Sequence, residues 1–179
     1  MPGGADAWRD LAARMARGAT VVFLCPEVFA QGDKPLAWLP LANKGSLSGL
    51  YGWLYLKDEW AKRHPVFDGL PAGGLMDYTY YREIIPDFVF SGQDAPAVAI
   101  AGANKVSQDY ASGLMVAEYE FGAGRFILNT LNLRDNLGTH PAAERLLRNT
   151  LRYADRDATT PLADLPSGFD VKLQEIGYR

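Results

Sequence analysis

The single cysteine of this chain, Cys25, follows an apolar run at residues 20–24, a position where several α/β enzymes carry a nucleophile. A nucleophile elbow needs small residues around the nucleophile, because its strand-to-helix turn is strained. Phe23 and Glu27 stand where those glycines would be, and Pro26 lacks the backbone N–H that would serve an oxyanion hole. The carboxylate of Glu27 also favours a raised thiol pKa. We therefore expect Cys25 to be a buried or half-buried structural residue.

The histidines available as bases are His64 and His140, and each precedes a proline. His140 falls at the expected start of a helix, where the positive end of the helix dipole favours a neutral imidazole. A Cys25–His140 dyad in a divergent amidohydrolase therefore stays open as an alternative. One cysteine and two histidines give neither an internal disulfide nor a zinc ligand set, and we expect no metal and no cofactor.

Aromatic and charged residues are concentrated in GLMDYTYYREIIPD, residues 74–87. Flat rings stack on sugar faces and carboxylates accept hydroxyl protons, so this segment and its upstream aromatics could bind carbohydrate. Tyrosine and tryptophan are also enriched at protein interfaces, and we favour that interpretation. Asp77 and Glu83 could alternatively form a glycosidase pair, because the sequence does not fix their separation. The candidate contact residues are Trp53, Tyr55, Trp60, Asp77, Tyr78, Tyr80, Tyr81 and Arg82.

The elements expected to position these residues begin with a helix at 6–17, whose apolar residues share one face and which ends at Gly18. Residues 20–25 follow as an apolar run without alternation, which is typical of a strand buried on both faces of a parallel sheet. The middle of the chain predicts a loop-rich stretch at 26–50, a strand at 51–56, a short helix at 58–63, turns at 64–74 and a short strand at 96–102.

The strongest strand signal lies at 113–131, where two apolar segments flank Gly122-Ala123-Gly124 and predict a hairpin. This glycine-rich turn joins two strands and does not open a helix, so it lacks the context of a phosphate cradle. A last helix is expected from an N-cap at Thr139 to Ala154, with Ala143, Leu147, Thr150, Leu151 and Ala154 on one face. Residues 155–179 show little periodicity and are expected to form an extended or frayed arm.

The whole chain is therefore expected to be one domain, 1–179, with a core at about 5–154. Its fold class is α/β: a three-layer α/β/α sandwich with a mostly parallel sheet, a C-terminal β-hairpin and a closing helix.

Composition excludes several classes of protein. The chain has 179 residues, 48% of them hydrophobic, and a formal net charge of −3, which argues against a nucleic-acid partner. No apolar run is long enough to span a membrane, and MPGGADAWRD lacks the features of a signal peptide. We expect a soluble protein, cytoplasmic or, as part of a longer exported parent, periplasmic or secreted.

Three motifs in order carry a family resemblance: HPVFDGLP at 64–71 with GLMDYTYY after it, YEFGAGRFIL at 119–128, and LLRNTLRY at 146–153. Over residues 19–154 the chain resembles the class I glutamine amidotransferase-like domain, as found in the C-terminal accessory domain of bacterial family-two, β-galactosidase-type glycoside hydrolases. The resemblance implies a flavodoxin-like fold. It carries over no catalytic residue, because Cys25 lacks its glycines and Ala142 follows His140-Pro141 where the family has glutamate.

The resemblance implies a non-catalytic accessory domain of a carbohydrate-active hydrolase, supporting interdomain or oligomer contacts or the edge of a glycan cleft. Its partners would be other domains of a glycoside hydrolase, a second copy of the chain, or carbohydrate. The alternatives are an independent hydrolase, using Cys25 or the Asp77/Glu83 pair, and a free-standing sugar-binding module.

Overall fold

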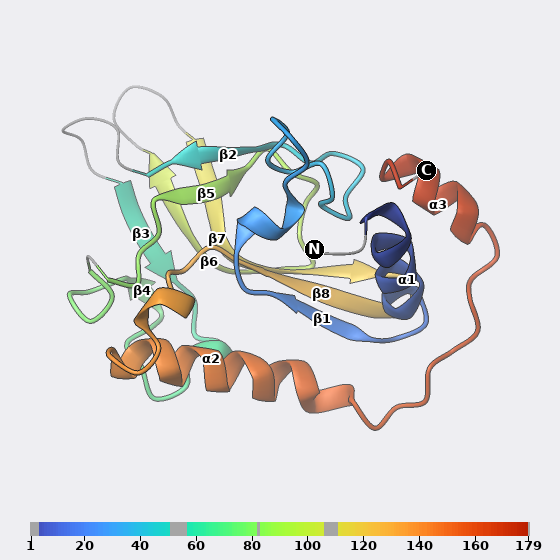
Figure 1. The fold of residues 1–179 in the computed structure, drawn as a ribbon. Coiled ribbons are helices and arrows are strands. Elements are labelled where there is room, and N and C mark those ends of the chain that lie inside the picture. The colour runs from blue at the N-terminus through green and yellow to red at the C-terminus, as the bar shows by residue number, and fades with distance from the viewer. Residues whose placement is uncertain (1–3, 51–56, 82, 106–110, 179) are drawn as a thin grey trace.

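The chain forms a mixed α/β structure built on one sheet of eight strands (Figure 1). The computed structural model describes residues 4–50, 57–81, 83–105 and 111–178. The helices are α1 (Gly4–Ala16), α2 (Pro141–Ala154) and α3 (Phe169–Glu175), with single turns η1 (Pro26–Phe29), η2 (Pro65–Phe67), η3 (Arg134–Asn136) and η4 (Asp155–Asp157). The strands are β1 (Thr20–Phe23), β2 (Ser46–Gly49), β3 (Lys57–Ala61), β4 (Gly74–Leu75), β5 (Phe88–Ser91), β6 (Val98–Lys105), β7 (Ala111–Phe121) and β8 (Gly124–Asn129).

Antiparallel pairing dominates the sheet. Its strand order is β1-β8-β7-β6-β3-β4, and β5 joins β7 at one position and carries β2. Among the described strands, β1 and β8 run parallel and every other pair is antiparallel. The α/β class and the C-terminal hairpin are confirmed, whereas the expected mostly parallel sheet is wrong. The reason is that β6, β7 and β8 follow one another in the chain and lie side by side, without the helical crossovers that parallel pairs need.

The sheet separates two cores of different composition. Along β8, Phe126 and Leu128 point to one side and Ile127 to the other, as the two-residue period of a strand requires. The side packed by α1, here called the aromatic face, contains Trp8, Phe23, Phe29, Trp38, Tyr119, Phe121, Phe126 and Tyr178. The side packed by α2, here called the aliphatic face, contains Val66, Ile84, Ile100, Met115, Ile127, Leu131 and Leu146.

Helix α1 agrees with its predicted helix and buries Trp8, Ala12, Met15 and Ala16. The helix ends against the β7–β8 hairpin at a very close approach. A Cβ atom on Gly124 would lie 2.3 Å from the carbonyl oxygen of Met15, so only glycine fits at the start of β8. The glycines of the hairpin therefore serve helix packing as well as the turn.

Helix α2 closes the aliphatic face, but it begins one residue later than predicted. His140, not Thr139, is the N-cap, and its Nδ1 accepts a hydrogen bond of 3.3 Å from the Ala142 N–H. The buried face consequently consists of Ala142, Ala143, Leu146, Asn149 and Thr150. Leu151, which was expected on that face, is 51% exposed.

Three predictions for the middle of the chain have different outcomes. The helix expected at 58–63 is wrong, because those residues enter β3, which pairs antiparallel with β6. The strand expected at 96–102 is β6, which begins and ends slightly later. The strand expected at 51–56 lies outside the described residues.

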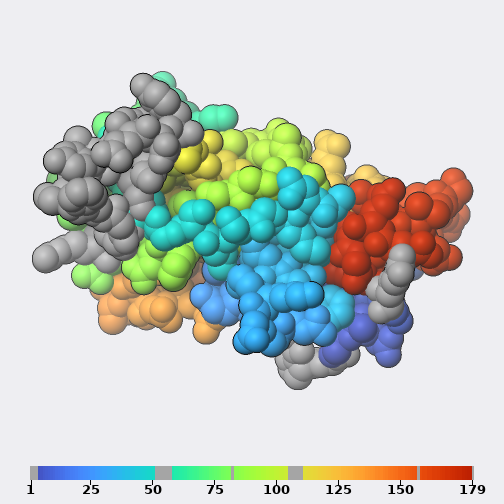
Figure 2. Space-filling view, turned by 90° about the horizontal axis from the view of Figure 1, so that it is seen from above, coloured from blue at the N-terminus to red at the C-terminus, as the bar shows by residue number. Residues whose placement is uncertain are grey.

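The C-terminal arm has an exposed part and an anchored part. Residues 158–168 are exposed throughout, whereas Ile176 and Tyr178 are buried on the aromatic face. The Tyr178 hydroxyl donates to the carbonyl oxygen of Trp38, and Lys44 Nζ donates to that of Ile176 at 2.8 Å. Figure 2 shows the C-terminal segment lying against the chain segment around residues 30–50. The arm is therefore anchored by its last helix, and it is not frayed throughout.

Among the helices of the described residues, none is both long and apolar enough to cross a membrane.

Candidate functional site

A pocket opens where β1 and β8 end. Because these two strands are parallel, the chain leaves both at the same edge of the sheet, which is the usual place for ligands in α/β proteins. The pocket has a volume of about 270 Å³, and we call it the carboxyl-end pocket. Its lining residues are Leu24, Cys25, Pro26, Glu27, Thr130, Leu131, Asn132, Leu133, Arg134 and Asp135.

Cys25 lies in this pocket as a neutral thiol. Burial raises its pKa, and the hydrogen-bonded carboxylate of Glu27 raises it further. Arg134 Nη1 lies 3.0 Å from the sulfur and opposes this shift, but its guanidinium is exposed to solvent and the pKa stays above its usual value. Pro26 is buried directly after the extended Cys25 backbone, so no N–H is available there for an oxyanion. This chemistry does not activate a nucleophile.

The two histidines each make a local contact with the backbone. His64 and His140 each precede a proline that opens a helical turn, and each Nδ1 accepts a hydrogen bond of 3.3 Å from the backbone N–H two residues on. No histidine occurs among the described residues that line the carboxyl-end pocket. Both histidines thus cap helical turns, a role that the repeated His-Pro dipeptide signals in the sequence.

The aromatic segment divides into surface and core residues. Tyr78 and Tyr81 are 89% and 62% exposed, and the apolar Leu75 and Phe88 near them in the chain are 67% and 50% exposed. We call these four side chains the exposed aromatic surface. Tyr80, by contrast, is fully buried, and its hydroxyl donates to the carbonyl oxygen of Pro71. Its ring therefore belongs to the core and offers no surface contact, contrary to expectation.

Of the remaining predicted contacts, Asp77 and Trp60 lie within the described residues. Asp77 Oδ1 accepts from the Thr79 N–H at 2.9 Å, which shapes the turn that presents Tyr78. Trp60 is half-buried, and its indole N–H points to Asn104 Oδ1 at 3.4 Å, while Lys62 Nζ lies 5.9 Å from its ring centre. Trp53, Tyr55 and Arg82 lie outside the described residues.

The aromatic segment is tied to the wall of the carboxyl-end pocket. The backbone N–H of Asn132 donates to the carbonyl oxygen of Ile84 at 2.9 Å, and its side-chain amide donates to that of Ile85 at 3.2 Å. Asn136 Nδ2 donates to the carbonyl oxygen of Glu83 at 2.8 Å. Two asparagines after β8 therefore hold the end of the aromatic segment, and Figure 1 shows β4 and the start of α2 at the same end of the molecule.

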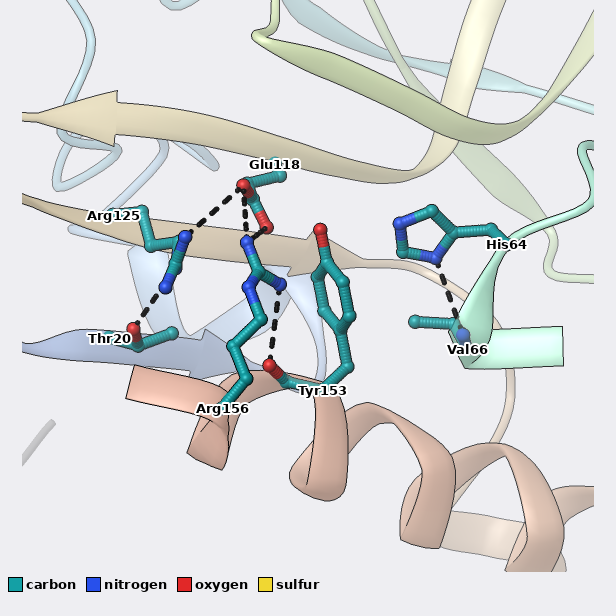
Figure 3. Close-up of polar contacts among 7 residues, drawn as sticks. All are labelled: Thr20, His64, Val66, Glu118, Arg125, Tyr153 and Arg156. Carbon is teal, nitrogen blue, oxygen red and sulfur yellow. Dashed lines mark hydrogen bonds and ion pairs between the residues drawn. The ribbon is translucent and has the colours of Figure 1, made fainter. Parts of the chain in front are cut away.

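A buried ion cluster lies elsewhere, under the aliphatic face (Figure 3). Glu118 on β7 is 5% exposed, and its carboxylate accepts hydrogen bonds of 3.1 and 3.2 Å from Arg156. Arg125 Nη1 lies 3.8 Å from the same carboxylate, and Arg125 Nε donates to the Thr20 hydroxyl at 3.2 Å. The cluster thus joins β7, β8 and η4 by ion pairs and adds β1 through the Thr20 hydrogen bond.

Two rings complete this cluster. The Arg156 guanidinium lies 3.6 Å from the ring centre of Tyr153, and the His64 ring lies 4.5 Å from the same ring. Burial lowers the pKa of His64 and raises that of Tyr153. Glu118 was not among the residues predicted from the sequence. Its place in the predicted hairpin could have indicated it. Glu118 lies between Ala117 and Tyr119, which face the aromatic side, so its side chain must point to the opposite, aliphatic face.

The part of the chain that the structure describes holds no group of three or more His, Cys, Asp or Glu residues placed to bind a metal. Comparison of the chain with protein-family models and with curated proteins returned no match. The described residues thus combine four exposed apolar side chains between residues 75 and 88 with a pocket whose thiol is not activated.

Proposed function

We propose that this chain is a non-catalytic, amidotransferase-like accessory domain of a carbohydrate-active hydrolase, and that it docks on a partner domain through the exposed aromatic surface. The observation that carries the proposal is the exposure of Leu75, Tyr78, Tyr81 and Phe88 within one short segment. Large apolar side chains gathered on a surface are typical of a protein contact, and tyrosine suits such contacts because it combines a ring with a hydroxyl.

The absence of catalysis is supported by Cys25 and its surroundings. A raised thiol pKa, a following proline and a lining without histidine among the described residues all disfavour acyl transfer at this position. The family assignment and the flavodoxin-like arrangement stay part of the proposal. Packing of α1 and α2 on opposite faces of the sheet supports them, while the antiparallel pairing departs from that fold.

The parent protein can be tested by sequencing the reading frame around this chain in both directions. We expect that frame, or one beside it, to encode a glycoside hydrolase. Co-expressed hydrolase should then co-purify with the tagged chain, and Tyr78→Ser with Tyr81→Ser should abolish the association. Val171→Ser, which removes a 58% exposed apolar side chain from α3, is the control and should retain it. A locus without a hydrolase would contradict the proposal, as would an association that the tyrosine variants leave intact.

The catalytic alternative is tested by activity. We expect the purified chain to release no ammonia from glutamine and to hydrolyse no aryl glycoside. Glutamine hydrolysis that disappears in Cys25→Ala would overturn the non-catalytic proposal, and glycoside hydrolysis lost in Asp77→Asn or Glu83→Gln would do the same.

A second candidate, a sugar-binding module, is favoured by the same two exposed rings, because an exposed tyrosine ring can stack on a pyranose face. Calorimetric titration with galactosides and glucosides separates the candidates. Binding that Tyr78→Ser abolishes would favour the module over the docking domain.

A further inference from the structure

The strand β1 forms one edge of the sheet. It stands first in the strand order and, among the described strands, pairs only with β8. The Arg125 N–H donates to the carbonyl oxygen of Ala19, so residues 19 and 21 direct their backbone groups toward β8. Because alternate residues of a strand point to opposite sides, the N–H and C=O groups of Thr20 and Val22 face away from the sheet.

The sequence of β1 gives this edge little protection against further strand pairing. It reads TVVF, with no charge, proline or glycine, and its register with β8 has no bulge. Edge strands usually carry such a feature or are covered, because a free edge is a template for aggregation. After the strand, Pro26 ends the edge, since it has no N–H and opens η1. Before the strand, protection would have to come from another part of the chain.

The C-terminal arm crosses the sheet where β1 begins. It starts from the aliphatic face, where Arg156 binds Glu118 at 3.1 Å, and it ends on the aromatic face, where Tyr178 is buried. Residues 158–168, which we call the strap, connect these two anchors. Figure 1 shows the strap passing around the end of the sheet at which β1 begins. The strap therefore links the two cores across this edge.

Two adjacent residues of the strap contact the chain just before β1. The Ala163 N–H donates to the carbonyl oxygen of Arg17 at 2.7 Å, and Arg17 Nε donates to the carbonyl oxygen of Ala163 at 2.9 Å. Leu162 packs on Gly18, because a Cβ atom on that glycine would lie 3.8 Å from Leu162 Cδ2. Gly18 has a φ of +122°, which L side chains rarely adopt, so this position favours glycine and lets Leu162 approach the backbone.

This contact occupies the place of a further strand. A strand paired with β1 would lie about 4.8 Å from it and would run past Thr20 into the place of Leu162 and Ala163. The strap and β1 also border one groove of about 650 Å³, whose lining includes Thr20, Val22 and Leu162. Between the strap and Pro26, only Thr20 and Val22 direct backbone groups outward. A free edge of this length offers few hydrogen bonds to a further strand.

We propose that the strap is a cover for the β1 edge: bound to Arg17, it prevents further strands from pairing with β1, and its release opens that edge. The strap takes the place of the charges, prolines and bulges that β1 lacks. Its anchors on both faces hold Ala163 near Arg17, so closing the contact costs little chain entropy. This role involves neither the exposed aromatic surface nor the carboxyl-end pocket, and it does not rest on the proposed function.

Hydrogen exchange of the full chain, followed by NMR, tests whether the strap is closed. Residues 162–164 are all exposed, so protection of the Ala163 amide would come from its bond to Arg17. We expect this amide to exchange about tenfold or more slowly than those of Leu162 and Asp164. Equal rates for the three amides would overturn the proposal.

Sedimentation velocity and thioflavin T fluorescence test what the closed strap prevents. Leu162→Asp should release the strap and raise the self-association constant about tenfold or more above that of the wild type. Leu165→Asp is the matched control, because Leu162 and Leu165 are 46% and 48% exposed, and it should behave as the wild type. Ala163→Pro, which cannot donate to Arg17, is a second way to release the strap and should act as Leu162→Asp does.

A charge on the edge separates strand pairing from other association. Val21→Lys, added to Leu162→Asp, should return self-association to the wild-type level, because lysine on an edge strand blocks pairing. Circular dichroism checks that each variant is folded. The proposal fails if Ala163→Pro and Leu162→Asp are folded and associate no more than the wild type. It also fails if the association persists in the variant with Val21→Lys.

Discussion

The two faces of the sheet are held together by different chemistry. On the aromatic face, Trp8 stacks on Trp38 with ring centres 6.0 Å apart and meets Tyr178 at the same distance, so stability there depends on large rings. On the aliphatic face the packing is by smaller side chains, and Glu118 is buried at its border between two arginines. One sheet is therefore covered by ring packing on one face and by aliphatic packing with a paired buried charge on the other, and the two faces should differ in their sensitivity to mutation and pH.

The largest effect should come from the aromatic face. Trp8→Ala removes the ring that contacts Phe23, Phe29, Trp38 and Tyr178, and we expect a loss of about 4 kcal/mol in the free energy of unfolding. Because Tyr178 loses a neighbour, proteolysis within 158–168 should also accelerate. Urea unfolding and limited trypsin digestion measure the two results. A loss below about 1 kcal/mol would mean that packing of the rings contributes little to the stability of this face.

Breaking the ion cluster should have the next largest effect. Glu118→Gln leaves two arginines without their carboxylate, and we expect a loss of about 3 kcal/mol, at the low end for buried pairs because the arginine side chains are 20% and 31% exposed. Glu120→Gln, on the same strand but exposed, is the control and should change stability by less than about 0.5 kcal/mol. Equal effects in urea unfolding would contradict the special role of Glu118.

The two faces should also respond to opposite ends of the pH scale. Burial lowers the pKa of Lys44, which anchors Ile176, to about 8. Between that value and the ordinary lysine pKa of about 10.4, the unfolded chain binds more protons, so this residue makes stability rise with pH. The free energy of unfolding should be measured by urea denaturation from pH 7 to pH 10 for the wild type and for Lys44→Met. The difference between the two pH profiles should isolate this rise. A flat difference would contradict the burial of the ammonium.

On the aliphatic face, the pH dependence of stability should appear at acid pH. His64 has a lowered pKa, so below the ordinary value of about 6.5 the unfolded state takes up a proton that the folded state resists. Stability should therefore fall as the pH drops below 6.5, and His64→Gln should lose this part of the dependence. Thermal melts from pH 7 to pH 5 measure it, and a wild-type melting temperature that drops no faster than that of the variant would rule it out.

The smallest effect on stability should come from the exposed aromatic surface. Tyr78 is 89% exposed, so Tyr78→Ser should change the free energy of unfolding by no more than about 0.5 kcal/mol. Tyr80→Ser, two residues away in the core, should cost several times more. If both substitutions are neutral in urea unfolding, the division of this segment into surface and core is incorrect.

The sequence predicted the elements that have strong local signals. The helix containing Trp8, the hairpin around Gly122 and the helix that ends at Ala154 all follow from periodicity and turn residues, and all are present, whereas α3 was not predicted. Residues 58–63 were misassigned because DEWAKR has helical composition, whereas its pairing with β6 is a tertiary contact that local propensity does not encode. The parallel sheet was wrong for a similar reason, since a run like TVVF suits either a central or an edge strand.

The candidate site was less predictable than the fold. Tyr78, Tyr80 and Tyr81 look alike in sequence, and only the turn shaped by Asp77 separates two exposed rings from a buried one. Glu118 resembles any surface carboxylate until Arg156, many residues later, is brought to it by the end of α2. Both distinctions depend on contacts between distant parts of the chain.

The pairing of β1 with β8 has a consequence for synthesis. Thr20 pairs with Arg125, about a hundred residues later, so the first strand has no neighbour until the hairpin has left the ribosome. During that interval Trp8, Phe23 and Phe29 have no sheet to pack against, because Phe126 and Leu128 have not yet emerged. The nascent chain therefore carries these three large rings exposed for most of translation, and that interval is when binding by a chaperone would matter most.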